Sequence, residues 1–381
     1  MSHALQPYSP PAPRLWTLDA LRGACALIVF LNHWHLWSNF APDGRWQHAV
    51  RRGGDLLYAL LHEVSWPPGG HHPAVICFFV LSGFCIHYPY ENRARAAFAG
   101  FDWPDYFRRR FWRIMPVYWT ASLLGLALIA VEMARPSGSQ LLQLHTEATT
   151  AGVAVRFAGL AGIYPREIFA GNYILNTVAV EMLMYALYPL FIRFASRGAW
   201  RTLGCIFSLG YLSTLLLVEV ATPYWVFNSV FMLGIFWFLG AYAAHVFVVS
   251  QSCIRGLWPA LAWITFTGLK FIPYFHGRNL VIQLCWGLVC ALGILWLLGR
   301  ERANLVKTSA GTKSVLQYFS RISYALYAVH TPVLMLATWS LLVTTHRQNY
   351  PLQLITGFLA SAAATLAVYY GVERVFYRPR N

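Results

Sequence analysis

Charged residues are scarce in this sequence: they make up 11% of its 381 residues, whereas 57% are hydrophobic. A soluble globular chain carries about 25% charged residues, so these few charges could not cover the surface of a soluble enzyme. The aromatic share of 16% also excludes a disordered coil. The composition predicts a polytopic membrane protein. At roughly 20 residues per span plus loops, its length accommodates about ten helices.

Several motifs of soluble catalysis are missing as well. The sequence contains no glycine-rich nucleotide cradle, no HExxH and no CxxC. Its seven cysteines show no paired spacing, so we interpret them as small buried hydrophobic residues. His71 and His72 are adjacent but have no supporting carboxylates. We therefore expect no metal cofactor.

Acidic residues are outnumbered, with 14 Asp and Glu against 29 Lys and Arg, which gives a net charge of +15. In a soluble protein this excess would indicate nucleic-acid binding. In a membrane protein it is explained by cytoplasmic loops, which collect Lys and Arg, so we expect no nucleic-acid partner. With ten spans and the N-terminus inside, the inner segments hold about twice as many Lys and Arg as the outer ones. Both termini are therefore predicted to be cytoplasmic.

Apolar runs predict where the spans lie. The candidate spans are 16–40, 72–92, 107–134, 171–195, 200–220, 224–250, 257–273, 279–299, 321–345 and 352–376. Residues 1–14, which are rich in proline, are expected to form a flexible cytoplasmic tail, and 41–71 and 135–170 to form outer loops. The whole chain, 1–381, is thus predicted to be a single all-α transmembrane domain in a lipid bilayer.

A charge at membrane depth costs at least ~2.5 kcal/mol, so each charge inside a span needs a reason. Asp19 and Arg22 are three residues apart in the first span and can pair. Arg22 and His33 are eleven residues apart, which places them on one helix face with a rise of about 16 Å. A histidine bonded to neighbouring backbone is an equally good interpretation of His33 alone.

Arg110 and Arg113 share a face at the start of the third span. Guanidinium groups bind phosphate in a bidentate manner, although ordinary anchoring at the inner surface is the alternative. Glu181 lies near the middle of the fourth span, with Tyr185 on its face and no Lys or Arg within one turn. A lone carboxylate there indicates a functional site, and a protonated carboxyl bonded between helices is the alternative.

Tyr327 and His330 are three residues apart in the ninth span. A substrate role and a helix–helix hydrogen bond are equally open for His330. Trp34, near the outer end of the first span, is a candidate for stacking on a sugar ring. Aromatic belts at the membrane interfaces account for most other Trp and Tyr residues.

Taken in order, these residues resemble the acyltransferase-3 family of integral membrane O-acyltransferases, which acetylate bacterial surface polysaccharides and O-antigens. The matching elements are Arg22 with His33, the motif Phe78 to Phe84, Arg110 with Arg113, Glu181, the motif Ser323 to Pro332, and Glu373 with Arg374. One position departs from the pattern: the family often has Trp five residues before its glutamate, and this chain has Asn176. The resemblance covers almost the whole chain.

The resemblance implies an acyl-CoA-dependent O-acetyltransferase of the bacterial inner membrane. Its co-substrate would be cytosolic acetyl-CoA or another acyl-CoA, and its acceptor a hydroxyl of a carbohydrate or glycolipid at the outer face. The donor site would comprise Asp19, Arg22, Arg110 and Arg113. The catalytic residues would be His33 as base and Glu181, with Trp34, Tyr185, Tyr327 and His330 as substrate contacts. Two other functions stay open: a proton-coupled secondary transporter with Glu181 and His33 as relay, and a glycan-export subunit without catalysis.

Overall fold

The structure, a computed structural model, describes residues 15–37, 72–92, 102–133, 149–162, 170–218, 225–250, 256, 261–262, 264–265, 279–306, 308–345 and 349–377. These residues form helices and no strands. The helices are α1 (Trp16–Trp37), α4 (Pro73–Asn92), α5 (Trp103–Met133), α6 (Thr150–Phe157), η2 (Ala170–Asn172), α7 (Leu175–Ala195), α8 (Trp200–Val218), α9 (Trp225–His245), η3 (Val246–Ser250), α11 (Asn279–Arg302), α12 (Ala310–Thr345), α13 (Tyr350–Val368), η5 (Tyr369–Glu373) and α14 (Arg374–Phe376).

The predicted all-α membrane bundle is confirmed. Nine of the ten predicted spans coincide with helices, and the remaining one, 257–273, falls almost wholly outside the described residues. Within the described part of the chain, seven helices are long and apolar enough to cross a membrane. The predicted tail 1–14 and outer loop 41–71 also lie outside the described residues. The predicted loop 135–170 is described in part and contains the short helix α6.

The largest difference from prediction is the start of α12. The helix begins at Ala310, eleven residues before the predicted span at 321. The added turns carry Lys313 and Gln317 and are too polar to register as an apolar run, yet nothing in them stops a helix. At the other end of the chain, α13 continues through the π-helical turn η5 into α14, so the last helical segment reaches Phe376.

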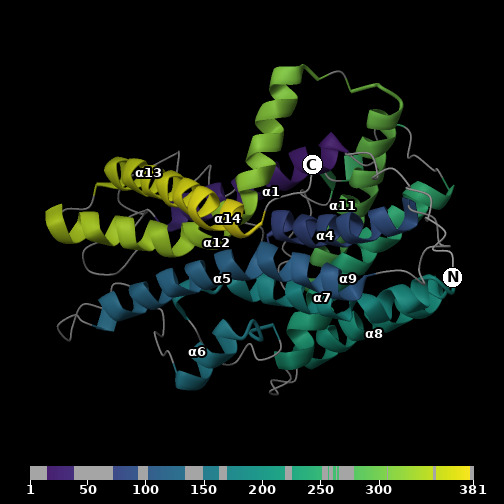
Figure 1. The fold of residues 1–381 in the computed structure, drawn as a ribbon, viewed down its shortest axis with the longest axis horizontal. Helices are drawn as coiled ribbons and strands as arrows, with labels where there is room; N and C mark the ends of the chain where they lie inside the picture. Colours follow the sequence, from purple (N-terminus) through teal and green to yellow (C-terminus); the bar gives the residue numbers. More distant parts are fainter. Residues whose placement is uncertain are drawn as a thin grey trace, which may run out of the picture.

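Two helices at the centre of the bundle, α4 and α9, touch backbone to backbone (Figure 1). A Cβ atom added at Gly83 would overlap the carbonyl of Trp237, and one added at Gly240 would overlap the carbonyl of Val80. Only glycine permits such an approach, because any side chain would push the helices apart. This contact fixes α4, which carries one wall of the site described below.

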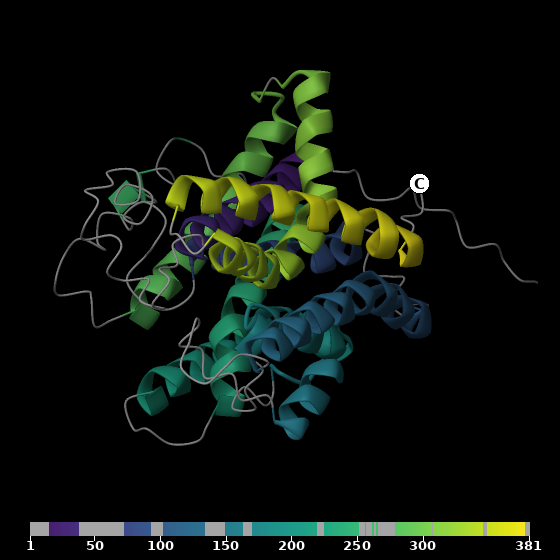
Figure 2. The same ribbon diagram turned by 90° about the vertical axis from the view of Figure 1, so that its left-hand side faces the viewer.

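The remaining helices lie on either side of this pair. Helix α12 packs along both α1 and α13, and α7 and α8 lie below α12 and α13 in both views (Figures 1 and 2). The beginnings of α1, α5 and α12 and the end of α14 contribute to one cavity, which places them at the same end of the bundle. This grouping of helix ends agrees with an up-and-down arrangement of consecutive spans.

Candidate functional site

A cavity of about 1060 Å³ opens between α1, α4, α5, α7, α12 and the end of the α13–α14 segment. Seven of the ten site residues predicted from the sequence line it: Asp19, Arg22, Arg110, Arg113, Glu181, Tyr185 and Tyr327. The other three, His33, Trp34 and His330, lie outside its lining. The structure thus divides the predicted residues between a cavity and a second cluster.

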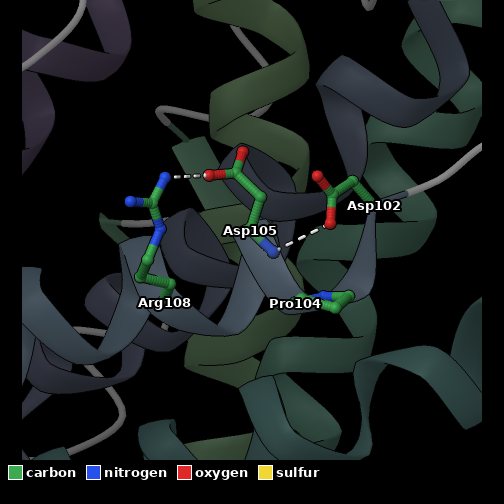
Figure 3. A pocket seen from close by; sticks show the side chains of 4 residues that line it. All are labelled: Asp102, Pro104, Asp105 and Arg108. Atoms are coloured by element: carbon green, nitrogen blue, oxygen red, sulfur yellow. Dashed lines mark hydrogen bonds and ion pairs between the residues drawn. The ribbon is translucent and has the colours of Figure 1, made fainter.

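The start of α5 carries four arginines, Arg108, Arg109, Arg110 and Arg113, which fall into two pairs. Figure 3 shows Arg108 of the first pair beside Asp105 and Asp102. Asp102 caps the helix by accepting a hydrogen bond from the Asp105 backbone N–H at 2.9 Å. The Asp105 carboxylate then binds the guanidinium groups of Arg108, at 2.7 Å, and Arg109. Both of these arginines are exposed, whereas Arg110 and Arg113 line the cavity. Surface anchoring therefore accounts for the first pair only.

The two inward arginines lie against tyrosine rings. The Arg110 guanidinium carbon is 4.9 Å from the centre of the Tyr185 ring, and that of Arg113 is 5.5 Å from the centre of the Tyr377 ring. Such cation–π contacts orient a guanidinium group without neutralising its charge. The N–H donors of Arg110 and Arg113 therefore stay available for an anion in the cavity.

The cavity as a whole carries more positive than negative groups. Arg22, Arg321 and Arg374 join Arg110 and Arg113 in its lining. The acidic residues there are Asp19, which accepts a hydrogen bond from Ser320 at 3.3 Å, Glu181 and Glu373. Five arginines against three carboxylates favour a ligand with several negative charges. Arg321 and Arg374 were not predicted as site residues, because ordinary anchoring at the inner surface explains them equally well.

Glu181 is the centre of a compact polar cluster in the cavity wall. Its Oε1 atom accepts hydrogen bonds from the Ser82 hydroxyl at 2.6 Å and from the Tyr185 hydroxyl at 2.5 Å. The two hydroxyl oxygens are themselves 2.9 Å apart. Tyr185 thus lies on the same helix face as Glu181, as its spacing predicts, and in addition bonds to it. Ser82 was not predicted, since it lies 99 residues away in the sequence.

His33 and His330 form a second cluster near the end of α1. His33 Nδ1 lies 2.9 Å from His330 Nε2, and His330 Nδ1 lies 2.8 Å from the Leu326 carbonyl oxygen. A carbonyl only accepts, so His330 carries its proton on Nδ1 and accepts at Nε2. His33 must then donate from Nδ1, which leaves Nε2 as its basic nitrogen. The Leu326 carbonyl therefore sets the tautomer of both rings.

The basic Nε2 atom of His33 faces Tyr173, whose hydroxyl is 3.5 Å away. Tyr173 is 42% exposed and follows Asn172, which is fully buried. The Asn172 amide donates to the carbonyls of Ala121, at 3.3 Å, and Ala328, at 2.9 Å. These bonds tie η2 to α5 and α12 and hold Tyr173 beside His33. Tyr173 was not predicted, because nothing in the sequence distinguishes it from other interfacial tyrosines.

One tyrosine lies between the two clusters. Tyr327 lines the cavity, where its hydroxyl is 2.7 Å from that of Thr177, and its ring centre is 6.2 Å from that of His330. Phe78, one helical turn from Ser82, packs against the same ring at 5.6 Å. Within the described residues, Glu181 bonds Ser82 and Tyr185 while His33 bonds His330 and Tyr173. The two predicted catalytic residues thus belong to separate clusters on either side of Tyr327.

Two further side chains have defined partners. The Trp34 indole N–H donates to the Leu354 carbonyl at 2.8 Å. Asn176, at the position where the family pattern often has Trp, accepts a hydrogen bond from Arg156 at 2.7 Å. Arg156 is 2% exposed, so its guanidinium group occupies space beside α7 that a tryptophan at position 176 would compete for.

The comparisons with known proteins point to one family. The acyltransferase-3 family model, described as "Acyltransferase domain", matches residues 15–372. No curated protein and no solved structure matches the chain. The match spans nearly the whole sequence and includes α1, α4, α5, α7 and α12, the helices that carry the two clusters. This chain therefore belongs to the acyltransferase-3 family of membrane acyltransferases.

Proposed function

We propose that this acyltransferase moves an acyl group, by preference acetyl, from cytosolic acyl-CoA to a hydroxyl of a carbohydrate or glycolipid at the outer face of the bacterial inner membrane. The observation that carries the proposal is the arginine-rich cavity. It opens at the end of the bundle where α1, α5 and α12 begin. Both termini lie on that side in the orientation that the Lys and Arg distribution predicts.

The phosphates of CoA suit the charged end of this cavity. Arg22, Arg110 and Arg113 supply guanidinium groups that bind phosphate oxygens in a bidentate manner. The narrow pantetheine arm then extends past Tyr185 toward the polar cluster at Glu181. The thioester reaches the interior of the bundle, where few water molecules compete with the acceptor for it.

The acceptor hydroxyl is activated by His33. Its Nε2 atom is the basic nitrogen, and the Tyr173 hydroxyl already approaches this atom at 3.5 Å. This distance is longer than a strong O–H···N hydrogen bond, so a substrate hydroxyl can take the place of Tyr173. An imidazole is a suitable base at neutral pH because its ordinary pKa is near 6.5. His330 holds the ring in the tautomer that the reaction needs.

Variants at the two clusters separate donor binding from transfer. Arg113→Ala should weaken CoA binding by roughly 10-fold to 100-fold, because a charge-assisted hydrogen bond is worth about 1.5–3 kcal/mol. Arg108→Ala is the matched control, since Asp105 already holds that exposed side chain on the surface. His33→Ala should keep CoA affinity and abolish acylation of the cell-surface glycans.

Equilibrium binding of CoA to the purified protein and mass spectrometry of surface glycans provide the two measurements. Equal CoA affinity in Arg113→Ala and wild type would contradict the assignment of the cavity as the donor site. Normal glycan acylation in cells whose only copy of the protein is the His33→Ala variant would contradict the assignment of His33 as the base.

A further inference from the structure

The hydroxyl of Ser82 has an unusual partner for a serine inside a membrane helix. Such hydroxyls generally donate to a carbonyl of their own helix, as Ser122 does to Tyr118 and Ser340 does to Leu336. Ser82 instead donates across to another helix, to the Glu181 carboxylate at 2.6 Å. A carboxylate at this distance is placed to accept the hydroxyl proton, which is the geometry of an activated nucleophile.

The position of Ser82 suits attack on a donor that enters from one side of the membrane. Ser82 lines the arginine-rich cavity. It lies ten residues before the end of α4 at Asn92, which corresponds to about 15 Å of helix. The next residue, Gly83, forms the close contact between α4 and α9, so the backbone that carries the hydroxyl is firmly held. Ser82 is therefore a fixed group halfway through the bundle and within reach of the cavity.

We propose that Ser82 is an acyl-carrying nucleophile, so that the reaction proceeds through an acyl-Ser82 ester. This inference rests on the proposed function, because it requires acyl-CoA in the cavity. Glu181 accepts the Ser82 proton as the Ser82 oxygen bonds to the thioester carbonyl carbon. The carbon–sulfur bond breaks, and the CoA thiolate takes the proton from Glu181. The Tyr185 hydroxyl, which also donates to Glu181, holds the carboxylate in place.

The second half-reaction consumes the ester. The Tyr327–Thr177 contact, which separates the His33 cluster from that of Ser82, opens. The acceptor hydroxyl then loses its proton to His33 and attacks the ester carbonyl. The carbon–oxygen bond to Ser82 breaks, and the Ser82 oxygen takes the proton from His33 through the same opening. Free enzyme is restored, and CoA and the acylated acceptor are the products. In this scheme CoA leaves before the acceptor reacts, so the two substrates never share the cavity.

Exchange of radiolabelled CoA into unlabelled acetyl-CoA tests the ester without knowledge of the acceptor. The wild-type protein should catalyse this exchange and should carry one acetyl group per chain after rapid removal of CoA. The exchange rate of Ser82→Ala should be at least about 10²-fold lower than that of the wild type, at unchanged CoA affinity. Ser122→Ala, a buried serine that bonds its own helix, is the matched control and should exchange normally. Ser82→Cys should carry a thioester that neutral hydroxylamine removes, in contrast to the oxygen ester of the wild type.

The results separate this proposal from the one on which it rests. Absence of CoA binding by the wild type would contradict the proposed function itself. CoA binding together with acceptor-dependent transfer but no exchange would overturn the ester alone. Peptide mapping that places the acetyl group on His33, or an undiminished adduct in Ser82→Ala, would overturn it as well.

Discussion

The glycine contact between α4 and α9 gives a prediction that depends on no functional assignment. Gly83→Ala adds one methyl group at a place where the two backbones meet. The new carbon would stand 2.8 Å from the carbonyl carbon of Trp237 and 3.0 Å from the amide nitrogen of Ala241. Nonbonded carbon atoms prefer about 3.5–4.0 Å, so the helices must part by roughly 1 Å. The obstacle is backbone, which cannot rotate away as a flexible side chain could.

The cost follows from that separation. A gap of about 1 Å forfeits up to half of the dispersion attraction of the atoms that face it. Overpacked cores lose about 1–3 kcal/mol, and we expect the upper part of this range, about 2–3 kcal/mol. A loss of 1 kcal/mol lowers Tm by about 2–4 °C in chains of 150–250 residues and by less in longer ones. The expected fall in Tm is therefore roughly 3–6 °C.

Thermal unfolding in detergent micelles, with Gly293→Ala as control, measures this effect. Gly293 lies inside α11, and a Cβ atom there meets nothing within 4 Å. Alanine in a helix interior is favoured over glycine by about 0.5–1 kcal/mol, so this variant should be as stable as the wild type or slightly more so. If Gly83→Ala unfolds at the wild-type temperature, or if Gly293→Ala loses as much, the close helix contact is wrong.

Two other variants test the contacts around the site. His330→Phe removes the acceptor for His33 Nδ1–H and should lower turnover by about 10²-fold or more at unchanged CoA affinity. His330→Gln keeps an acceptor oxygen and should restore part of the rate. Equal rates in the two variants would show that the tautomer does not matter. Asn176→Ala removes a partner of the buried Arg156 and should lower the free energy of unfolding by about 1.5–3 kcal/mol, which is measured as a lower Tm. An unchanged Tm would show that the Arg156–Asn176 hydrogen bond contributes nothing to stability.

The elements of this fold were largely predictable from sequence, because the signal for a membrane helix is local. A run of about 20 apolar residues needs no knowledge of its neighbours to be recognised. The common placement of Arg110 and Arg113 in one cavity likewise follows from their spacing along a single helix. The early start of α12 was missed for the same reason, since its first turns lack the apolar signal.

The partners across helices were not predictable. Ser82 and Glu181 are 99 residues apart, and His33 and His330 are 297 apart. No periodicity within one helix encodes a contact with another, so the sequence indicated that Glu181 and His33 needed partners without showing which. The sequence therefore did not show that the two residues belong to separate clusters with Tyr327 between them.

The hydrogen bond between Tyr327 and Thr177 has a consequence for the membrane itself. Groups that exchange protons lie on both sides of it: Glu181 in the cavity, and the histidine pair beyond. A continuous water path between them would conduct protons and dissipate the gradient that the cell maintains. The Tyr327 ring and its contact with Thr177 lie between the two clusters. The proposed acyl transfer would therefore have to open this contact only briefly, under the same constraint that a transporter obeys when it never exposes its site to both faces at once.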